Sequence, residues 1–84
     1  MSHVAHDLNS EFPDDAEALH DLKVNNRHFQ QIAERHHEVN REIHRIEAGV
    51  EAASDERLEA LKKTRLALLD DVAGMIAGTK RQSA

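Results

Sequence analysis

The apolar residues between positions 29 and 50 recur at alternating intervals of three and four. The repeat runs without a slip, and its members are Phe29, Ile32, His36, Val39, Ile43, Ile46 and Val50. Such intervals place side chains on one face of an α-helix, because the helix completes a turn every 3.6 residues. The pattern therefore predicts a long amphipathic helix over about residues 26–48, preceded by a break at Asn25-Asn26, which also supplies an N-cap.

A second long helix is predicted over about residues 55–77. Ser54 is a suitable N-cap, and Asp55 and Glu56 place acidic side chains in the first turn. The three-four spacing continues here through Leu58, Leu61, Arg65, Leu68, Val72 and Met75. Beside this stripe lie further apolar residues, namely Leu66, Leu69, Ala73 and Ile76. This apolar face is wider than one partner helix can cover.

A short turn at about residues 49–54 joins the two helices. Gly49 is suited to the left-handed conformation that ends many helices. Because the turn is short, we expect the helices to lie antiparallel, so that Ile43 meets Leu61 and Ile32 meets Val72. The sequence thus predicts an all-α fold, an antiparallel and coiled-coil-like helical hairpin.

The residues before the hairpin predict a short helix over about 12–23. Its apolar positions are Phe12, Ala16, Leu19 and Leu22, and Pro13 is tolerated in a first helical turn. Residues 1–9 show no periodicity, so we predict a mobile N-terminus there and a mobile C-terminus over 78–84. The chain of 84 residues is read as a single domain, 1–84.

The small size of the chain favours self-association. A chain of this length buries little apolar surface alone, and Phe12 and Phe29 are its only aromatic residues. The surplus apolar face of the last helix is left for the first helix, for a second copy, or for both. We predict a homodimeric bundle, with Leu66, Leu69 and Ile76 as the residues that anchor a partner.

Composition excludes several kinds of chemistry. Cysteine is absent, so there is no disulfide and no thiolate, and no stretch approaches the apolar length of a membrane span. Serine occurs only in the tails or at helix ends, and no phosphate loop or catalytic triad is present. We expect no enzymatic activity, no cofactor, no metal, no membrane association and a cytoplasmic location.

The charge of the chain argues against nucleic-acid binding. The net charge is −5, and Lys23 is the only Lys or Arg within residues 1–24. The basic cluster Lys62-Lys63-Thr64-Arg65 is the one feature that suggests a nucleic-acid-associated regulator, and Glu59 offsets it at helical spacing. That regulator remains an alternative function.

Histidine is unusually frequent, with seven residues in the chain. The histidines of the second helix are not spaced to converge on a metal, while His3 and His6 have a suitable offset in the predicted mobile end. His36 differs because the repeat places it inside the seam. One interpretation is a purely structural buried histidine; the other is a pH-sensitive core, in which acid must charge a neutral buried imidazole. A metal-responsive or pH-responsive protein is thus a second alternative.

Five short stretches also carry a resemblance to a known family. They occur in order and at family spacing: Phe12-Pro13-Asp14-Asp15, His20-Asp21-Leu22-Lys23, His28-Phe29, His44-Arg45-Ile46-Glu47 and Leu61-Lys62-Lys63-Thr64-Arg65-Leu66-Ala67-Leu68. From about Leu8 to Ile76 the chain resembles the small bacterial YdcH-like family. The resemblance implies a short helical protein of a domain family without known function, and it brings no catalytic or ligand residues. Leu69 stands where the family more often has Lys, which makes the last helix more apolar here.

Taken together, these features predict a small helical protein–protein interaction module whose specific role and protein partner are unknown.

Overall fold

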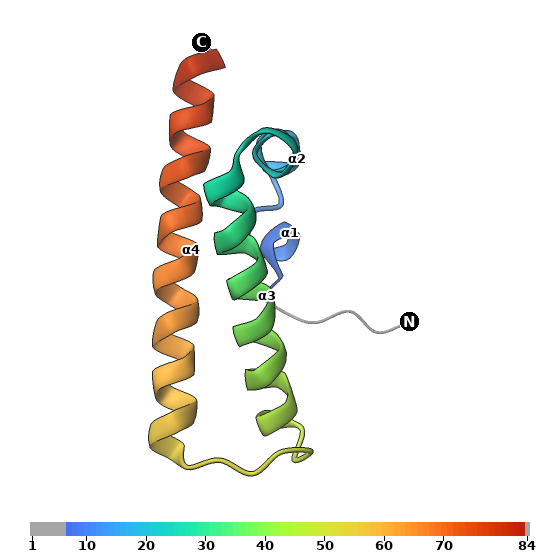
Figure 1. Cartoon of the computed structure of the whole chain (residues 1–84), viewed down its shortest axis with the longest axis vertical. Helices are drawn as coiled ribbons and strands as arrows, with labels where there is room; N and C mark the ends of the chain where they lie inside the picture. The colour runs from blue at the N-terminus through green and yellow to red at the C-terminus, as the bar shows by residue number, and fades with distance from the viewer. Residues whose placement is uncertain (1–6, 84) are drawn as a thin grey trace.

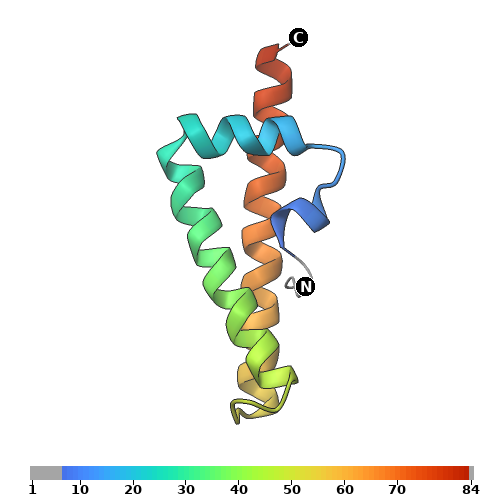
Figure 2. The ribbon, with the colours of Figure 1, turned by 90° about the vertical axis from the view of Figure 1, so that its right-hand side faces the viewer.

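The computed structural model describes residues 7–83, and within that range the chain forms helices and no strand. The elements are α1 (Leu8–Glu11), α2 (Ala16–Asn25), α3 (Arg27–Glu47) and α4 (Asp55–Ser83). Helices α3 and α4 run side by side in opposite directions and are joined by the turn at the bottom of Figure 1. Helix α2 lies crosswise over the pair near its other end (Figure 2). The predicted all-α hairpin with a short N-terminal helix is confirmed.

Helix α3 begins and ends, and helix α4 begins, close to the residues that the sequence indicated. The side-chain oxygen of Asn26 accepts a hydrogen bond of 2.9 Å from the backbone N–H of Phe29. Ser54 caps α4 in the same way, accepting from the N–H of Arg57 at 3.1 Å. Gly49 has a φ of +80°, and the N–H groups at the end of α3 turn back onto the carbonyl groups of Arg45 and Ile46. This is a Schellman end, which a residue with a side chain adopts only with strain.

One continuous core joins three of the helices. Its buried apolar residues are Leu19 and Leu22 of α2, Phe29, Ile32, Val39 and Ile43 of α3, and Leu68, Val72 and Ile76 of α4. Along the hairpin, an ion pair of 2.9 Å between Lys62 and Glu47 links the two helices near the turn. Arg57 forms a second ion pair with Glu42, which is also close to the turn. Both pairs join the last turns of α3 to the first turns of α4, which lie side by side in an antiparallel hairpin.

The predicted start of the first helix at residue 12 is wrong. The chain makes two helices in this region, because Asp7 caps a short one by accepting a 2.8 Å hydrogen bond from the N–H of Ser10. That helix ends at Glu11 with Phe12 as its C-cap, and Pro13 lies in the following turn rather than in a first helical turn. Helix α2 starts only at Ala16. Pro13 therefore follows a short helix instead of occupying the N1 position of the next one.

The last helix is longer than predicted. Helix α4 continues to Ser83 instead of ending near residue 77, and Gly74 and Gly78 both lie inside it. Neither glycine has a positive φ, so neither ends the helix. Of the predicted mobile N-terminus, residues 7–9 are described and enter α1, while residues 1–6 lie outside the described residues, as does Ala84.

No helix within residues 7–83 combines the length and the apolar character needed to cross a bilayer.

Candidate functional site

The interior of the hairpin holds a polar link between α3 and α4. Asn40 is 3% exposed, and its Oδ1 accepts a 3.0 Å hydrogen bond from Nη1 of Arg65. The three-four spacing placed Arg65 in the seam of the last helix, and its guanidinium turns to Asn40 of α3. Asn40 itself was missed, because a count of apolar positions passes over a polar residue next to the seam. The pair satisfies a buried amide oxygen and connects the helices at one register.

His36 lies deeper than any other described titratable residue. Its side chain is 2% exposed, and Nε2 has no hydrogen-bond partner among the described residues. Burial lowers the pKa of His36 from its ordinary value of 6.5, because the imidazolium would lose its hydration. The positive charges of Arg65 and His37 lower that pKa further.

Two carboxylates oppose this shift. Glu11 of α1 and Asp7, which caps α1, both raise the pKa of His36, but by less than burial lowers it. His36 is therefore surrounded by charges from three elements: Arg65 on α4, His37 on α3 and the acids at α1. Leu8 of α1 lines an open pocket together with His36, so α1 lies beside the buried imidazole. The predicted pH-sensitive position is thus buried, as the heptad repeat indicated.

The predicted anchor residues of α4 do not lie on one surface. Leu66 is 60% exposed and Leu69 is partly buried, whereas Ile76 is only 4% exposed. Ile76 belongs to the same core as Leu19 and Leu22 of α2, so its prediction as an exposed anchor is corrected. The reason is that α2 crosses the C-terminal half of α4 and covers that part of the helix (Figure 2).

An exposed surface remains on the side of α4 that faces away from α3. We call it the outer face, and its members are Lys63, Leu66, Leu69, Asp70 and Ala73. Two other large apolar side chains are strongly exposed, Val24 at 60% and Val50 at 76%. Val24 lies in the last turn of α2 and Val50 in the turn of the hairpin, so both are isolated. Leu66 is different because it lies in the middle of the longest helix, beside Leu69.

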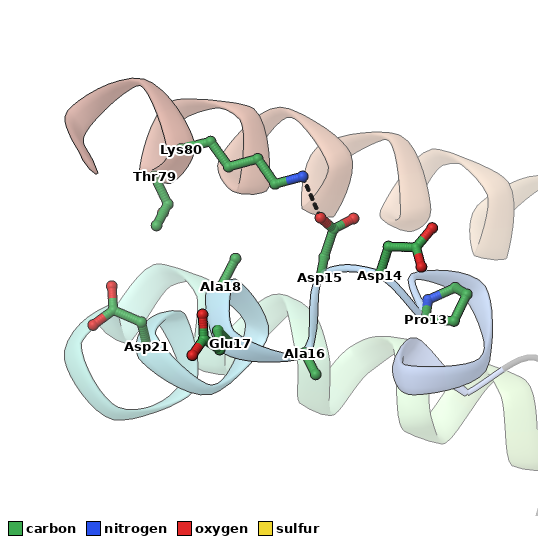
Figure 3. Close-up of a pocket in the computed structure, with 9 residues that line it drawn as sticks. All are labelled: Pro13, Asp14, Asp15, Ala16, Glu17, Ala18, Asp21, Thr79 and Lys80. Carbon is green, nitrogen blue, oxygen red and sulfur yellow. Dashed lines mark ion pairs between the residues drawn. The ribbon is translucent and has the colours of Figure 1, made fainter. Parts of the chain in front are cut away.

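A second open pocket lies where α2 begins and α4 ends. Lys80 reaches from α4 to the side chain of Asp15, with which it forms an ion pair (Figure 3). Asp14, Glu17 and Asp21 also line this pocket and make it acidic. The ion pair fastens the first residues of α2 to the last turns of α4. Its role is structural, since an acidic surface at a helix start already complements the helix dipole.

The histidines and acids do not assemble a metal site in the described part of the chain. Within residues 7–83, no group of three or more His, Asp or Glu side chains is close enough together to hold an ion. His20, His28, His37 and His44 are all exposed. His3 and His6, which have a suitable spacing, lie outside the described residues.

The side chains of the basic cluster of α4 point to different partners and do not form one basic surface. Lys62 pairs with Glu47 at 2.9 Å, and Lys63 lies 3.7 Å from Glu59. Arg65 turns inward to Asn40, and Thr64 donates a hydrogen bond to the backbone carbonyl of Ala60. The four residues do not form the continuous basic ridge that a phosphate backbone requires.

Comparison with known proteins gives a family but no function. Neither the curated proteins nor the solved structures contain a match to this chain. A family model described as a protein of unknown function, DUF465, matches residues 29–76, which is most of the hairpin and more than half of the chain. This match agrees with the resemblance to YdcH-like proteins, and it confirms that the chain belongs to the DUF465 family.

Proposed function

We propose that this chain is a protein–protein interaction module that uses the outer face of α4 and has no enzymatic activity of its own. The observation that carries the proposal is the exposure of Leu66, 60% in the middle of the longest helix. Isolated apolar residues are common on protein surfaces and need no explanation. Leu66 has Leu69 and Ala73 on the same side of the helix, at intervals of three and four residues, which is the pattern of a helix-packing surface.

The energetics of this face favour a weak homodimer. Burying a leucine side chain contributes about 1.5–3 kcal/mol, while association costs roughly 4–15 kcal/mol in lost freedom of motion. Leu66 and the partly buried Leu69 from each of two copies supply apolar surface that offsets this cost by only a small margin. We therefore propose a homodimer that dissociates on dilution. An additional protein partner and a cytoplasmic location remain predictions.

The alternative functions receive less support. The basic residues of α4 are engaged with Glu47, Glu59 and Asn40, which weakens the case for a nucleic-acid-associated regulator. A metal-responsive role lacks a cluster of ligands among the described residues. A response to pH has one supporting observation, the buried His36.

The test is to place charge on the outer face and measure molar mass. Leu66→Glu and the double variant Leu66→Glu/Leu69→Glu should reduce the molar mass, measured by light scattering over a range of concentrations, to that of a monomer. Helicity should be retained, because Leu66 lies outside the core. Val24→Glu is the matched control, since Val24 is also 60% exposed; it should leave the molar mass unchanged. If the Leu66 variants keep both the wild-type molar mass and the wild-type set of co-purifying proteins, the proposed interaction face is wrong.

A further inference from the structure

The outer face carries two opposite charges placed symmetrically about Leu66. Lys63 and Asp70 are seven residues apart, which is about two helical turns, so they lie on the same side of α4. Both are exposed. Asp70 forms no ion pair with any other residue in the range 7–83, and Lys63 has only the distant contact with Glu59, in which both side chains are more than 70% exposed. Both charges are therefore available to a partner.

A two-fold axis midway between these charges would pass between Leu66 and Ala67. If a second copy of α4 packs antiparallel about that axis, residues at equal distances on either side of it meet. Leu66 then lies against Leu66 of the second copy. Lys63 lies beside Asp70 of the second copy, and the same pair forms again by symmetry. Two ion pairs thus flank the Leu66 contact on one side, and Leu69 packs along its other side.

Other arrangements of the same two helices lose the two ion pairs. In a parallel packing, the two-fold axis runs along the helices and places the Lys63 and Asp70 flanks of the two copies on opposite sides of the contact, so neither charge lies beside its opposite. An antiparallel packing moved by about one turn toward the C-terminus places the two Asp70 side chains together at the axis. The opposite movement does the same to Lys63. Like charges placed opposite each other are destabilising, so the charge pattern selects the register centred at Leu66.

We infer that the partner of the outer face is a second copy of this chain, packed antiparallel along α4 with Lys63 of each copy beside Asp70 of the other. This arrangement rests on the proposed homodimer and adds to it the direction of packing and the register. The surface is complementary to itself, which is the condition for a closed dimer with one isologous interface.

Reversal of the charges tests the pairing. Lys63→Asp places two carboxylates together at both symmetric positions, and Asp70→Lys places two lysines there. Each single variant should weaken dimerisation about tenfold, because two attractive pairs become two repulsive ones. The double variant Lys63→Asp/Asp70→Lys restores opposite charges and should return the dissociation constant, measured by sedimentation equilibrium, to near the wild-type value.

Matched controls separate this effect from general changes of charge. Arg41→Asp and Glu38→Lys make the same changes of charge at exposed positions of α3, and both should leave the dissociation constant unchanged. If Leu66→Glu dissociates the dimer while Lys63→Asp/Asp70→Lys dimerises no better than the two single charge variants, the register is wrong, but the use of the outer face is retained. A wild-type chain that stays monomeric at every concentration overturns both the proposed homodimer and this arrangement of it. If Leu66→Glu leaves the molar mass and the co-purifying proteins unchanged, the proposed function fails as well.

Distances between spin labels give an independent test of direction. The chain has no cysteine, so a single introduced cysteine is labelled at one site. Each residue advances about 1.5 Å along the helix, so labels at Glu56→Cys and Arg81→Cys should lie about 30 Å and about 45 Å from their symmetry mates. A parallel dimer would give similar, short distances at both sites. That result would overturn the antiparallel arrangement, but it would not contradict the proposal that Leu66 lies in the interface.

Discussion

Helices α3 and α4 pack against each other, but they use their apolar residues differently. On α3, the buried residues Phe29, Ile32 and Ile43 follow one narrow stripe, and no large apolar side chain of this helix is strongly exposed. On α4, Leu68 and Val72 are buried while Leu66 remains 60% exposed. The difference shows that a narrow apolar stripe is buried completely within the monomer, whereas a wide one leaves apolar side chains exposed, where they can bind another molecule.

The largest effect should come from truncation of the α3 stripe. Phe29→Ala removes a ring that is 2% exposed, and the loss of burial together with the cavity should lower the free energy of unfolding by about 3–5 kcal/mol. Leu66→Ala should change it by less than about 0.5 kcal/mol, provided that the protein is dilute enough to be monomeric. Denaturant unfolding followed by circular dichroism measures both. Similar losses in the two variants would show that Leu66 belongs to the core.

Acid should weaken the α3 stripe through His36. Burial lowers the pKa of folded His36 below 6.5, the value expected in the unfolded chain, so the unfolded state binds more protons between those two pKa values. The contribution of His36 to stability is therefore complete above pH 6.5 and is lost as the pH falls toward the lowered pKa. Between pH 7.5 and pH 5.5, the melting temperature of wild type should therefore fall further than that of His36→Leu.

His37→Gln is the matched control for this experiment. His37 is the exposed neighbour of His36 on α3, and its replacement should preserve most of the acid sensitivity of wild type. The carboxylates Glu11 and Asp7 oppose the shift, so Glu11→Gln should increase that sensitivity. Equal losses of melting temperature in wild type and His36→Leu would exclude His36 as the titrating group.

A smaller effect is expected at the polar link between the two helices. Asn40→Ala should cost about 1 kcal/mol, because the 3.0 Å hydrogen bond to Arg65 is lost, while the partly exposed guanidinium still reaches water. A double-mutant cycle with Arg65→Met measures the coupling, which should be about 0.5–1.5 kcal/mol. A coupling near zero would mean that Asn40 and Arg65 stabilise the hairpin independently.

The smallest effect should come from the ion pairs on the hairpin surface. Lys62 and Glu47 are both about half exposed, at 45% and 49%, so solvent screens their attraction. Lys62→Ala should therefore lower stability by no more than about 1 kcal/mol, and added salt should reduce the difference from wild type. A larger, salt-insensitive loss would indicate that the aliphatic stem of Lys62 packs on the hairpin.

The sequence was most informative where one pattern had one physical cause. The predicted helix 26–48 is observed as Arg27–Glu47, because its seam, its Asn26 cap and the left-handed Gly49 all agree. The start of α4 was predictable from Ser54 for the same reason. The heptad repeat also placed His36 correctly in the interior.

The sequence was less informative where distant segments meet. Asn40 is buried because Arg65 approaches it from α4, and no local pattern shows that approach. Ile76 is covered by α2, whose crossing direction depends on packing rather than on periodicity. The last helix was predicted to end near residue 77, but Lys80 beyond that point pairs with Asp15, and this tertiary contact supports the final turns.

The joining of α2 to the last turns of α4 also bears on the order in which the chain folds. Leu19 and Leu22 share their core with Ile76, and Asp15 is held by Lys80, so the segment synthesised early depends on the segment synthesised late. While the chain is still on the ribosome, α2 therefore lacks the part of its packing surface that α4 supplies. Its docking must follow synthesis, and a nascent chain that stops before residue 76 would leave the two leucines open to chaperones and proteases.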